Sequence, residues 1–317
     1  MRERELIDRI RELAGTSPNR GVVLGIGDDC AVLSPANGSQ ILVTTDFSIE
    51  DVHFRQAWHP ATSVGHRCLT RGLSDIAAMG GSPIACFLSL GLPSRLPKIW
   101  PDDFLRGLRS LAKKYKVQLA GGDISAAQKI IADIVVVGEA PAGTAVRRSG
   151  ASPGDRIYVT GSLGGSAAVL HQLMAGKKVR AAKSSAHFYP QPRLEVGQWL
   201  RRRGTATAMI DLSDGLSVDL PHICRESGVA AQIVAAQIPI ARHASLELAL
   251  HGGEDYELLF TARPGAKLPT RIAGVTITEI GKILNPANYS SAIQILGENG
   301  RVRRLAQRGW EHFAKKR

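Results

Sequence analysis

Residues 208–220, AMIDLSDGLSVDL, contain an apolar run, a glycine turn and a second apolar stretch. The first run predicts a buried strand and the residues after Asp214 predict a helix, so this segment is a strand–turn–helix unit. Asp211 and Asp214 lie three positions apart at this junction, beside Ser213 and Gly215. Because carboxylates are costly to bury, such a pair next to a turn is typical of a binding site.

Acidic residues recur beside apolar runs and glycines elsewhere in the chain. Oxygen ligands without a companion His or Cys suit hard cations, above all Mg²⁺. Several carboxylates gathered in one cleft would repel each other strongly without a cation, so we expect several Mg²⁺ ions bridged by phosphates. The further motifs are GIGDDC (Asp28, Asp29), ILVTTDF (Asp46), GLSDIAAMGG (Asp75), LAGGDIS (Asp123) and HGGEDYELLF (Glu254, Asp255).

Each of these motifs also has a purely structural interpretation. Asp next to Gly is common turn chemistry, and Ser213 or Asp214 is a suitable cap for the helix that follows. Residues 159–170, VTGSLGGSAAVL, fit either an anion site on backbone amides or a tight turn. The structural interpretation accounts for each turn separately, but it does not explain why so many of the turns are acidic.

The composition is that of a globular chain long enough for two domains, with 317 residues, 44% hydrophobic and 5% aromatic. No run approaches the ~18 apolar residues of a membrane span. The N-terminal segment MRERELIDRIRELAG has no apolar signal-peptide core. We therefore expect a cytoplasmic protein with no membrane partner. The cysteines show no C-x-x-C pair, which disfavours zinc and disulfides: Cys30, Cys68, Cys86 and Cys224.

The formal net charge is +12, with basic runs at RRRG (201–204), RVRR (301–304) and AKKR (314–317). These runs fit either a solvated basic surface or contacts with anionic small molecules or nucleic acid. No nucleic-acid-binding module is visible and aromatic residues are not interleaved with the basic runs, so we expect no nucleic-acid partner.

Hydrophobic periodicity predicts alternating helices and strands, and hence an α/β chain of two domains. The Gly-, Pro- and Ser-containing segment RRSGASPGD (147–155) is the best boundary, which gives domains 1–147 and 148–317. We expect helices at 3–13, 63–79, 102–115, from about 165, at 193–202 and after 214. We expect strands at 40–46, ending at Asp46, and at 83–93, 117–123, 130–140, 156–161, 208–211, 257–262 and 276–284.

Taken in order, the motifs resemble those of the thiamine-monophosphate kinase family, in the superfamily of aminoimidazole ribonucleotide synthetase and selenophosphate synthetase. The resemblance runs from about residue 21 to 313. It rests on GIGDDCAVL, TTDFSIEDVHF, LSDIAAMGG, GGD, RSGASPGD, IDLSDGL and GGEDYELLF.

The resemblance implies an enzyme that uses ATP and Mg²⁺ to convert thiamine phosphate to thiamine diphosphate, the last step of thiamine diphosphate biosynthesis. It also implies a homodimer with an aminoimidazole ribonucleotide synthetase-like fold. Residues 1–147 would be the ATP- and Mg²⁺-binding domain, whose sheet pairs in the dimer, and 148–317 would complete the active site.

Carried over position by position, the resemblance implies a role for individual residues. The metal ligands would be Asp29, Thr44, Thr45, Asp46, Asp75, Asp123, Asp211 and Asp214. ATP would meet Gly122, Asp123, Arg148 and Ser213, and thiamine phosphate would meet His53, Glu254 and Trp310.

The chemistry of the acceptor favours direct in-line transfer without a general base. The second pKa of a phosphate monoester is ~6, so the attacking oxygen is already anionic at neutral pH. Bringing this dianion to the γ-phosphate is an electrostatic problem, which Mg²⁺ and Arg148 would solve. Two alternatives stay open: a phosphorylated intermediate on His53, and a packing role for Trp310.

The chain departs from the family pattern at Asp51, where glycine is usual, at Gly72, where asparagine is usual, and at Arg67, where lysine is usual. These positions concern the loop around His53 and the helix that presents Asp75.

Two sister enzymes are disfavoured. Selenophosphate synthetase needs a reactive Cys and a Lys near the N-terminus, and residues 1–27 contain neither. The motif GGEDYELLF disfavours aminoimidazole ribonucleotide synthetase. A non-catalytic nucleotide or Mg²⁺ sensor on the same scaffold is the remaining alternative.

Overall fold

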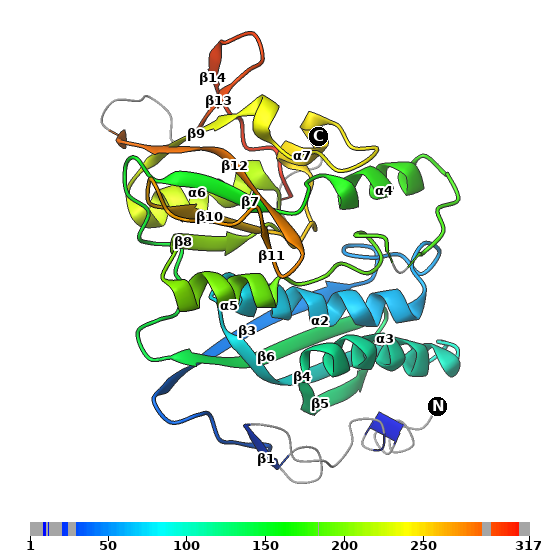
Figure 1. Ribbon diagram of the computed structural model, residues 1–317. Coiled ribbons are helices and arrows are strands. Elements are labelled where there is room, and N and C mark those ends of the chain that lie inside the picture. Colours follow the sequence, from blue (N-terminus) through cyan, green and yellow to red (C-terminus); the bar gives the residue numbers. More distant parts are fainter. Residues whose placement is uncertain are drawn as a thin grey trace. The chain divides into compact units, whose positions relative to one another are not determined.

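A computed structural model describes residues 9, 10, 12, 21–24, 30–182, 184–286 and 293–310 of the chain (Figure 1). The chain divides into unit 1, Met1–Ile76 with Gly81–Thr144 and Arg180–Pro190, and unit 2, Ala77–Gly80 with Ala145–Val179 and Gln191–Arg317. Most of the predicted helix 3–13, and Asp29, lie outside the described residues. The boundary at 147/148 stays a prediction. Within the described ranges, no helix is both long and apolar enough to cross a membrane.

Unit 1 contains a mixed four-stranded sheet and long helices (Figure 1). β6 is antiparallel to both of its neighbours, β3 and β4, whereas β4 and β5 are parallel. In sheet order the strands are β3 (Ser39–Ile49), β6 (Ile131–Pro141), β4 (Ser82–Leu92) and β5 (Gln118–Ala126). The helices are α2 (Ala61–Ala78) and α3 (Ile99–Tyr115), and a separate pair of strands is β1 (Val22–Leu24) and β2 (Val32–Leu33).

The strand that carries Asp46 is longer than the sequence predicts. β3 pairs with β6 along its whole length, from Ser39 opposite Pro141 to Ile49 opposite Ile131. The prediction that this strand ends at Asp46 was therefore wrong, because its partner strand continues the ladder for three more residues. Asp46 lies inside a strand, and its orientation is fixed by the pleat of the sheet.

The two helices of unit 1 cross at glycines. A Cβ on Gly107 of α3 would lie 1.8 Å from the carbonyl oxygen of Thr62, and a Cβ on Gly65 of α2 would lie 1.9 Å from that of Phe104. Both distances are far below van der Waals contact, so any side chain at either position would push the helices apart. This close crossing holds α2, the helix that carries Asp75, in a fixed position within unit 1.

Unit 2 is built on an eight-stranded sheet in which every named pairing except that of β9 with β13 is antiparallel. In sheet order the strands are β14 (Val302–Arg304), β13 (Ile293–Leu296), β9 (Ala230–Val234), β12 (Val275–Leu284), β7 (Arg156–Thr160), β10 (Leu258–Ala262) and β8 (Ala206–Asp211), and β11 (Arg271–Ile272) pairs with β12. The helices are α4 (Gly165–Met174), α5 (Leu194–Arg203), α6 (Leu216–Ser227) and α7 (Leu246–His251), with a 3₁₀ turn η1 (Ala235–Gln237).

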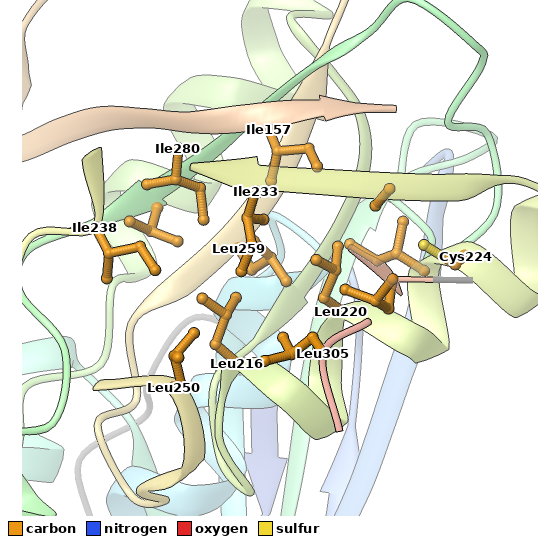
Figure 2. Close-up of a cluster of buried hydrophobic side chains, with 14 of the residues drawn as sticks. Ile157, Leu216, Leu220, Cys224, Ile233, Ile238, Leu250, Leu259, Ile280 and Leu305 are labelled. Carbon is orange, nitrogen blue, oxygen red and sulfur yellow. The ribbon is translucent and has the colours of Figure 1, made fainter. Parts of the chain in front are cut away.

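The core of unit 2 lies between α6 and the sheet (Figure 2). Leu216, Leu220 and Cys224 follow each other at four-residue spacing on α6, so their side chains share one face of the helix. They belong to the same buried cluster as Leu259 of β10 and Ile280 of β12, both fully buried. Burying this face fixes α6, and with it the turn that precedes the helix.

The Gly-rich turn at residues 159–170 binds a carboxylate of its own chain. Asp255 accepts the N–H of Gly164 at 2.6 Å and that of Ser166 at 3.3 Å, at the start of α4. Burial raises the pKa of Asp255 to about 7, and these N–H donors oppose the rise. The segment is therefore a tight turn in which the carboxylate of Asp255 already binds the backbone N–H groups. Asp255 has a structural role there.

Gly72 faces the sheet from α2. A Cβ on Gly72 would lie 2.5 Å from Cγ2 of Val136 on β6, and Val136 is fully buried. The space that the family's usual asparagine would occupy is thus filled by Val136.

We expect Gly72→Asn to lower the free energy of unfolding by about 1–3 kcal/mol, because it overpacks this contact. Val136→Ala alone should also destabilise, by about 1–2 kcal/mol, since it removes buried methyl groups. In the double variant the new side chain fills the space that the valine leaves, so the loss should be smaller than the sum. Urea unfolding of the four proteins measures this coupling, and strict additivity would contradict the contact.

Candidate active site

Two carboxylates and a hydroxyl meet in unit 1. Thr44 and Asp46 are two positions apart on β3 and therefore point to the same face of the sheet. Thr44 donates its hydroxyl hydrogen bond to Oδ2 of Asp75, which α2 presents. Burial raises the pKa of Asp46 to about 7, and the Asp75 carboxylate adds to the rise while Arg71 opposes it.

This pair has the electrostatics of a cation site. Two carboxylates that face each other cannot both ionise cheaply, so one of them retains a proton near neutral pH. A divalent cation would replace that proton, and oxygen ligands of this kind are those that Mg²⁺ prefers. The donor chemistry of Thr44, Asp46 and Asp75 thus fits Mg²⁺.

Thr45 and Asp123 are not part of this group. Thr45 points to the opposite face of β3, where its hydroxyl donates to Asp133 at 2.8 Å. Asp123 on β5 pairs with Ser89, and Ser89 pairs with Asp133, so Asp123 shares the face of Thr45. Within the part of the chain that the structure describes, no three His, Cys, Asp or Glu side chains come close enough together to hold a metal ion.

Gly122 and Asp123 of the GGD motif are exposed residues of β5. Gly122, with φ of 151°, passes so close to β4 that a Cβ would lie 1.9 Å from the carbonyl oxygen of Leu88. Only glycine fits this approach, which gives the GGD motif a structural reason besides the predicted contact with ATP.

The turn that carries His53 is fixed by backbone and side-chain hydrogen bonds. Nδ1 of His53 accepts the N–H of Ile49 at 3.0 Å, so the neutral imidazole carries its proton on Nε2. Asp51, two residues earlier, has φ of 66°, in the left-handed region that glycine adopts most readily. The family's usual glycine is thereby explained, and in this chain Asp51 also pairs with Lys129 at 2.8 Å.

Arg67 joins the His53 turn to a distant segment of unit 1. Its Nη2 donates to the carbonyl oxygen of His53 at 3.2 Å, and its Nη1 donates to that of His187. The planar guanidinium can hold two carbonyls at once, which the single ammonium of a lysine does less rigidly. The departure from lysine therefore strengthens the support of the His53 turn.

α2 and the residues before it hold residues 187–190 by several further contacts. Nε2 of His59 lies 3.0 Å from Nε2 of His187, and both rings are buried. Oγ of Ser63 donates to the carbonyl oxygen of Phe188 at 2.8 Å, and Nε2 of His66 lies 2.7 Å from that of Pro190. The sequence carries no local signal for these contacts, since the partners are more than 120 positions apart.

In unit 2, three separate motifs meet around the LSDG turn. The N–H of Glu254 donates to the carbonyl oxygen of Ser213 at 2.7 Å, and that of Tyr256 donates to Leu212 at 2.9 Å. The N–H of Trp310 approaches the carbonyl oxygen of Asp214 at 3.3 Å. Ser213, Asp214, Glu254 and Trp310 are thus brought together, as the resemblance implies for residues that share a site.

The conformation of this region is unusual for its residue types. Glu254 and Tyr256 both have positive φ, 65° and 51°, although neither is glycine. Such strained backbone is typical of functional sites. Trp310 is 50% exposed, so it does not pack as a buried anchor.

Asp219 holds the LSDG turn together, a role that we did not predict. Its Oδ2 accepts the N–H groups of Ser213 and Asp214 at 3.1 Å and of Gly215 at 3.0 Å. Burial and the Asp214 carboxylate raise the pKa of Asp219 to about 7, while the N–H donors oppose the rise. The interpretation of Ser213 or Asp214 as the cap of α6 was wrong, because its N-cap is Gly215 without a side-chain cap bond.

The remaining predicted residues of unit 2, Asp211 and Arg148, lie outside the turn itself. Asp211 is the last residue of β8, as predicted, and is 5% exposed. Arg148 is exposed, and its carbonyl oxygen accepts a hydrogen bond from Oγ of Ser227 at 3.2 Å.

Comparison with known proteins gives one consistent family. Residues 27–140 match the N-terminal domain, and residues 152–291 the C-terminal domain, of the AIR synthase related proteins. The chain is 37% identical, over 97% of its length and 95% of the relative, to the thiamine-monophosphate kinase of Escherichia coli (strain K12).

Solved structures agree with this result. The crystal structure of thiamine-monophosphate kinase from Stenotrophomonas maltophilia K279a superposes with a TM-score of 0.81 at 33% identity, covering 96% of this chain and 98% of that one. A structure of AaThiL complexed with AMPPCP and TMP gives a TM-score of 0.78 at 29% identity, covering 99% of both chains. The two-domain fold expected from the sequence is confirmed, and the chain belongs to the thiamine-monophosphate kinase family.

Proposed function

We propose that this chain phosphorylates thiamine phosphate with ATP and yields thiamine diphosphate and ADP, the last step of thiamine diphosphate biosynthesis. The observation that carries the proposal is the full-length similarity to AaThiL, which was solved with AMPPCP and TMP together. AMPPCP is an ATP analogue that cannot transfer its γ-phosphate, so the pair represents both substrates.

Each unit offers oxygen ligands for Mg²⁺. In unit 1, Thr44, Asp46 and Asp75 already form a carboxylate pair with a hydroxyl; in unit 2, Asp211 ends β8 and Asp214 lies in the LSDG turn. Mg²⁺ would supply charge neutralisation for the phosphates. Asp29, Thr45 and Asp123 remain proposed ligands from the family resemblance alone.

The other residues would bind and orient the two substrates. Gly122, Asp123, Arg148 and Ser213 would meet ATP. His53 would donate from Nε2 to the phosphate of thiamine phosphate, since its Nδ1 is an acceptor. Glu254 and the half-exposed indole of Trp310 suit the cationic, aromatic rings of thiamine.

The chemistry needs no general base on the protein. The acceptor oxygen is already ionised at neutral pH, so no proton must leave it during attack. Catalysis then consists of aligning the phosphates in line and neutralising their charge, to which Arg148 would contribute. This argues against a covalent intermediate on His53, whose role is contact.

Asp46→Asn and Asp211→Asn distinguish the kinase from a non-catalytic Mg²⁺ or nucleotide sensor. Each removes one negative ligand at nearly constant shape, so we expect thiamine diphosphate formation to fall at least about 100-fold. Addition of Mg²⁺ should also raise the melting temperature of the wild type but not that of Asp46→Asn.

The assay follows ADP and thiamine diphosphate with and without thiamine phosphate, and Asp103→Asn serves as the control. Asp103 is also a carboxylate of unit 1, but it lies on α3 and pairs with Arg106 at 2.6 Å. Unchanged activity in Asp46→Asn would remove the metal assignment. A wild type that binds ATP but releases no ADP would support the sensor.

Arg67→Lys tests the support of His53. The variant keeps the charge but loses the two-pronged hydrogen bond to the carbonyls of His53 and His187. We expect the KM for thiamine phosphate to rise about 3- to 10-fold, with kcat and the KM for ATP nearly unchanged. An equal rise in both KM values would show a general loss of structure instead.

A homodimer would cover an apolar face of unit 1. Ile41, Val43 and Phe47 alternate along β3 and are 44%, 65% and 55% exposed. Val43 lies opposite Val137 of β6, which is itself buried, so the exposed apolar side chains are those of β3. Exposed apolar surface of this kind is typical of an interface.

Val43→Glu should shift the mass measured by light scattering from dimer to monomer, because it would bury a charge in the interface. Arg109→Glu on the exposed side of α3 is the matched control and should leave the mass unchanged. A monomeric wild type at all concentrations would refute the dimer. The cytoplasmic location remains a prediction from the sequence.

A further inference from the structure

A cavity of about 1240 Å³ opens in unit 2 and is lined by part of the RRRG run whose role the sequence left open. It lies where β8 begins, between the end of α5 and the chain that follows β10. The lining residues that matter for its chemistry are Gly150, Trp199, Arg203, Thr207, Arg263 and Lys267.

The cavity wall is cationic. Arg203, Arg263 and Lys267 contribute positive charge, and no carboxylate lines the cavity in the described part of the chain. The buried carboxylate of Asp155 lies behind the wall, where its Oδ2 accepts the Thr207 hydroxyl at 2.7 Å and the Ser152 N–H at 3.0 Å. The carboxylate of Asp155 is therefore used by structural hydrogen bonds. The charged side chains that line the cavity are all cationic.

The end of α5 does not cancel this charge. A helix C-terminus carries partial negative charge on its last carbonyl groups. Here the N–H of Gly204 bonds the carbonyl oxygen of Arg201, and the N–H of Thr205 bonds that of Leu200. Arg201 itself is turned away, with its Nε donating to the carbonyl oxygen of Gly80 at 2.7 Å.

Trp199 adds an aromatic surface to the wall. Its ring lies one helical turn before Arg203, whose guanidinium carbon is 5.7 Å from the ring centroid. An indole beside a guanidinium offers stacking for a planar ring and hydrogen bonds for an anion. The volume exceeds the ~300–1,000 Å³ of typical small-molecule sites, so a nucleotide with its hydration fits.

The cavity is separate from the candidate active site in unit 2. Thr207 is near the start of β8, whereas Asp211 ends it and leads into the LSDG turn. Four residues of extended strand span roughly 13 Å. Ligand binding at one end of β8 can therefore be measured apart from chemistry at the other.

We propose that this cavity binds a nucleoside polyphosphate at a second site, with Arg203, Arg263 and Lys267 on the phosphates and Trp199 against the base. The proposal does not depend on the identity of the phosphoryl acceptor.

Calorimetric titration with ADP and with pyrophosphate, without Mg²⁺ and at low salt, tests the site. Arg203→Gln/Arg263→Gln/Lys267→Gln removes the cationic wall. Arg301→Gln/Arg303→Gln/Arg304→Gln removes the same formal charge from exposed positions at β14, and is the matched control. We expect the cavity variant to weaken ADP binding at least about tenfold and the control variant less than about twofold.

The base contact is tested by Trp199→Ala, which should weaken ADP about 3- to 10-fold and leave pyrophosphate unchanged. Equal losses in the cavity and control variants would show that only net charge matters, and would overturn the site. Equal binding of ADP and pyrophosphate by the wild type would overturn the nucleoside assignment. Thiamine diphosphate formation is assayed in parallel and should persist in the cavity variant. Loss of ADP binding at the cavity can then be told apart from a failure of the kinase proposal.

Discussion

The burial of carboxylates is the constraint on which the functional parts of this protein depend. Asp46, Asp219 and Asp255 are all withdrawn from water, which raises the pKa of each to about 7. The carboxylates of Asp219 and Asp255 accept hydrogen bonds from backbone N–H groups, which stabilise their negative charge. Both residues therefore stabilise turns. Asp46 faces a second carboxylate, Asp75, and this repulsion is one that a bound cation would relieve.

Hydrogen bonds of the main chain fix the LSDG turn and bring distant motifs to it. Asp219 gathers the N–H groups of the turn, so that the carbonyl oxygens of Ser213 and Asp214 are available to Glu254 and Trp310. Motifs 40 to 100 positions apart are thereby tied to one turn by main-chain bonds. Because backbone groups carry this arrangement, the side chains that would meet substrates are not needed to hold it together.

Much of this architecture could be predicted from periodicity and motif order, because strands and amphipathic helices are local properties of the chain. Sheet pairing is not local, so the extension of β3 beyond Asp46 became visible only from its eleven-residue register with β6. The separation of Thr45 from Thr44 and Asp46 did have a signal, since adjacent residues of a strand point to opposite faces. The tether on His53 through Arg67 and His187 had none.

The departures from the family pattern show how the same site is kept with different residues. Gly72 on the helix leaves room for the side chain of Val136 on the sheet. Asp51 accepts a left-handed conformation and gains a bond to Lys129. Arg67 holds two carbonyl oxygens with one planar guanidinium in place of the usual lysine ammonium. Each of these residues makes contacts of its own, and the hydrogen bond between Thr44 and Asp75 is present beside them. In this chain the three departures lie in the residues that support the candidate site, and Thr44, Asp46 and Asp75, which carry its oxygen atoms, keep the family pattern.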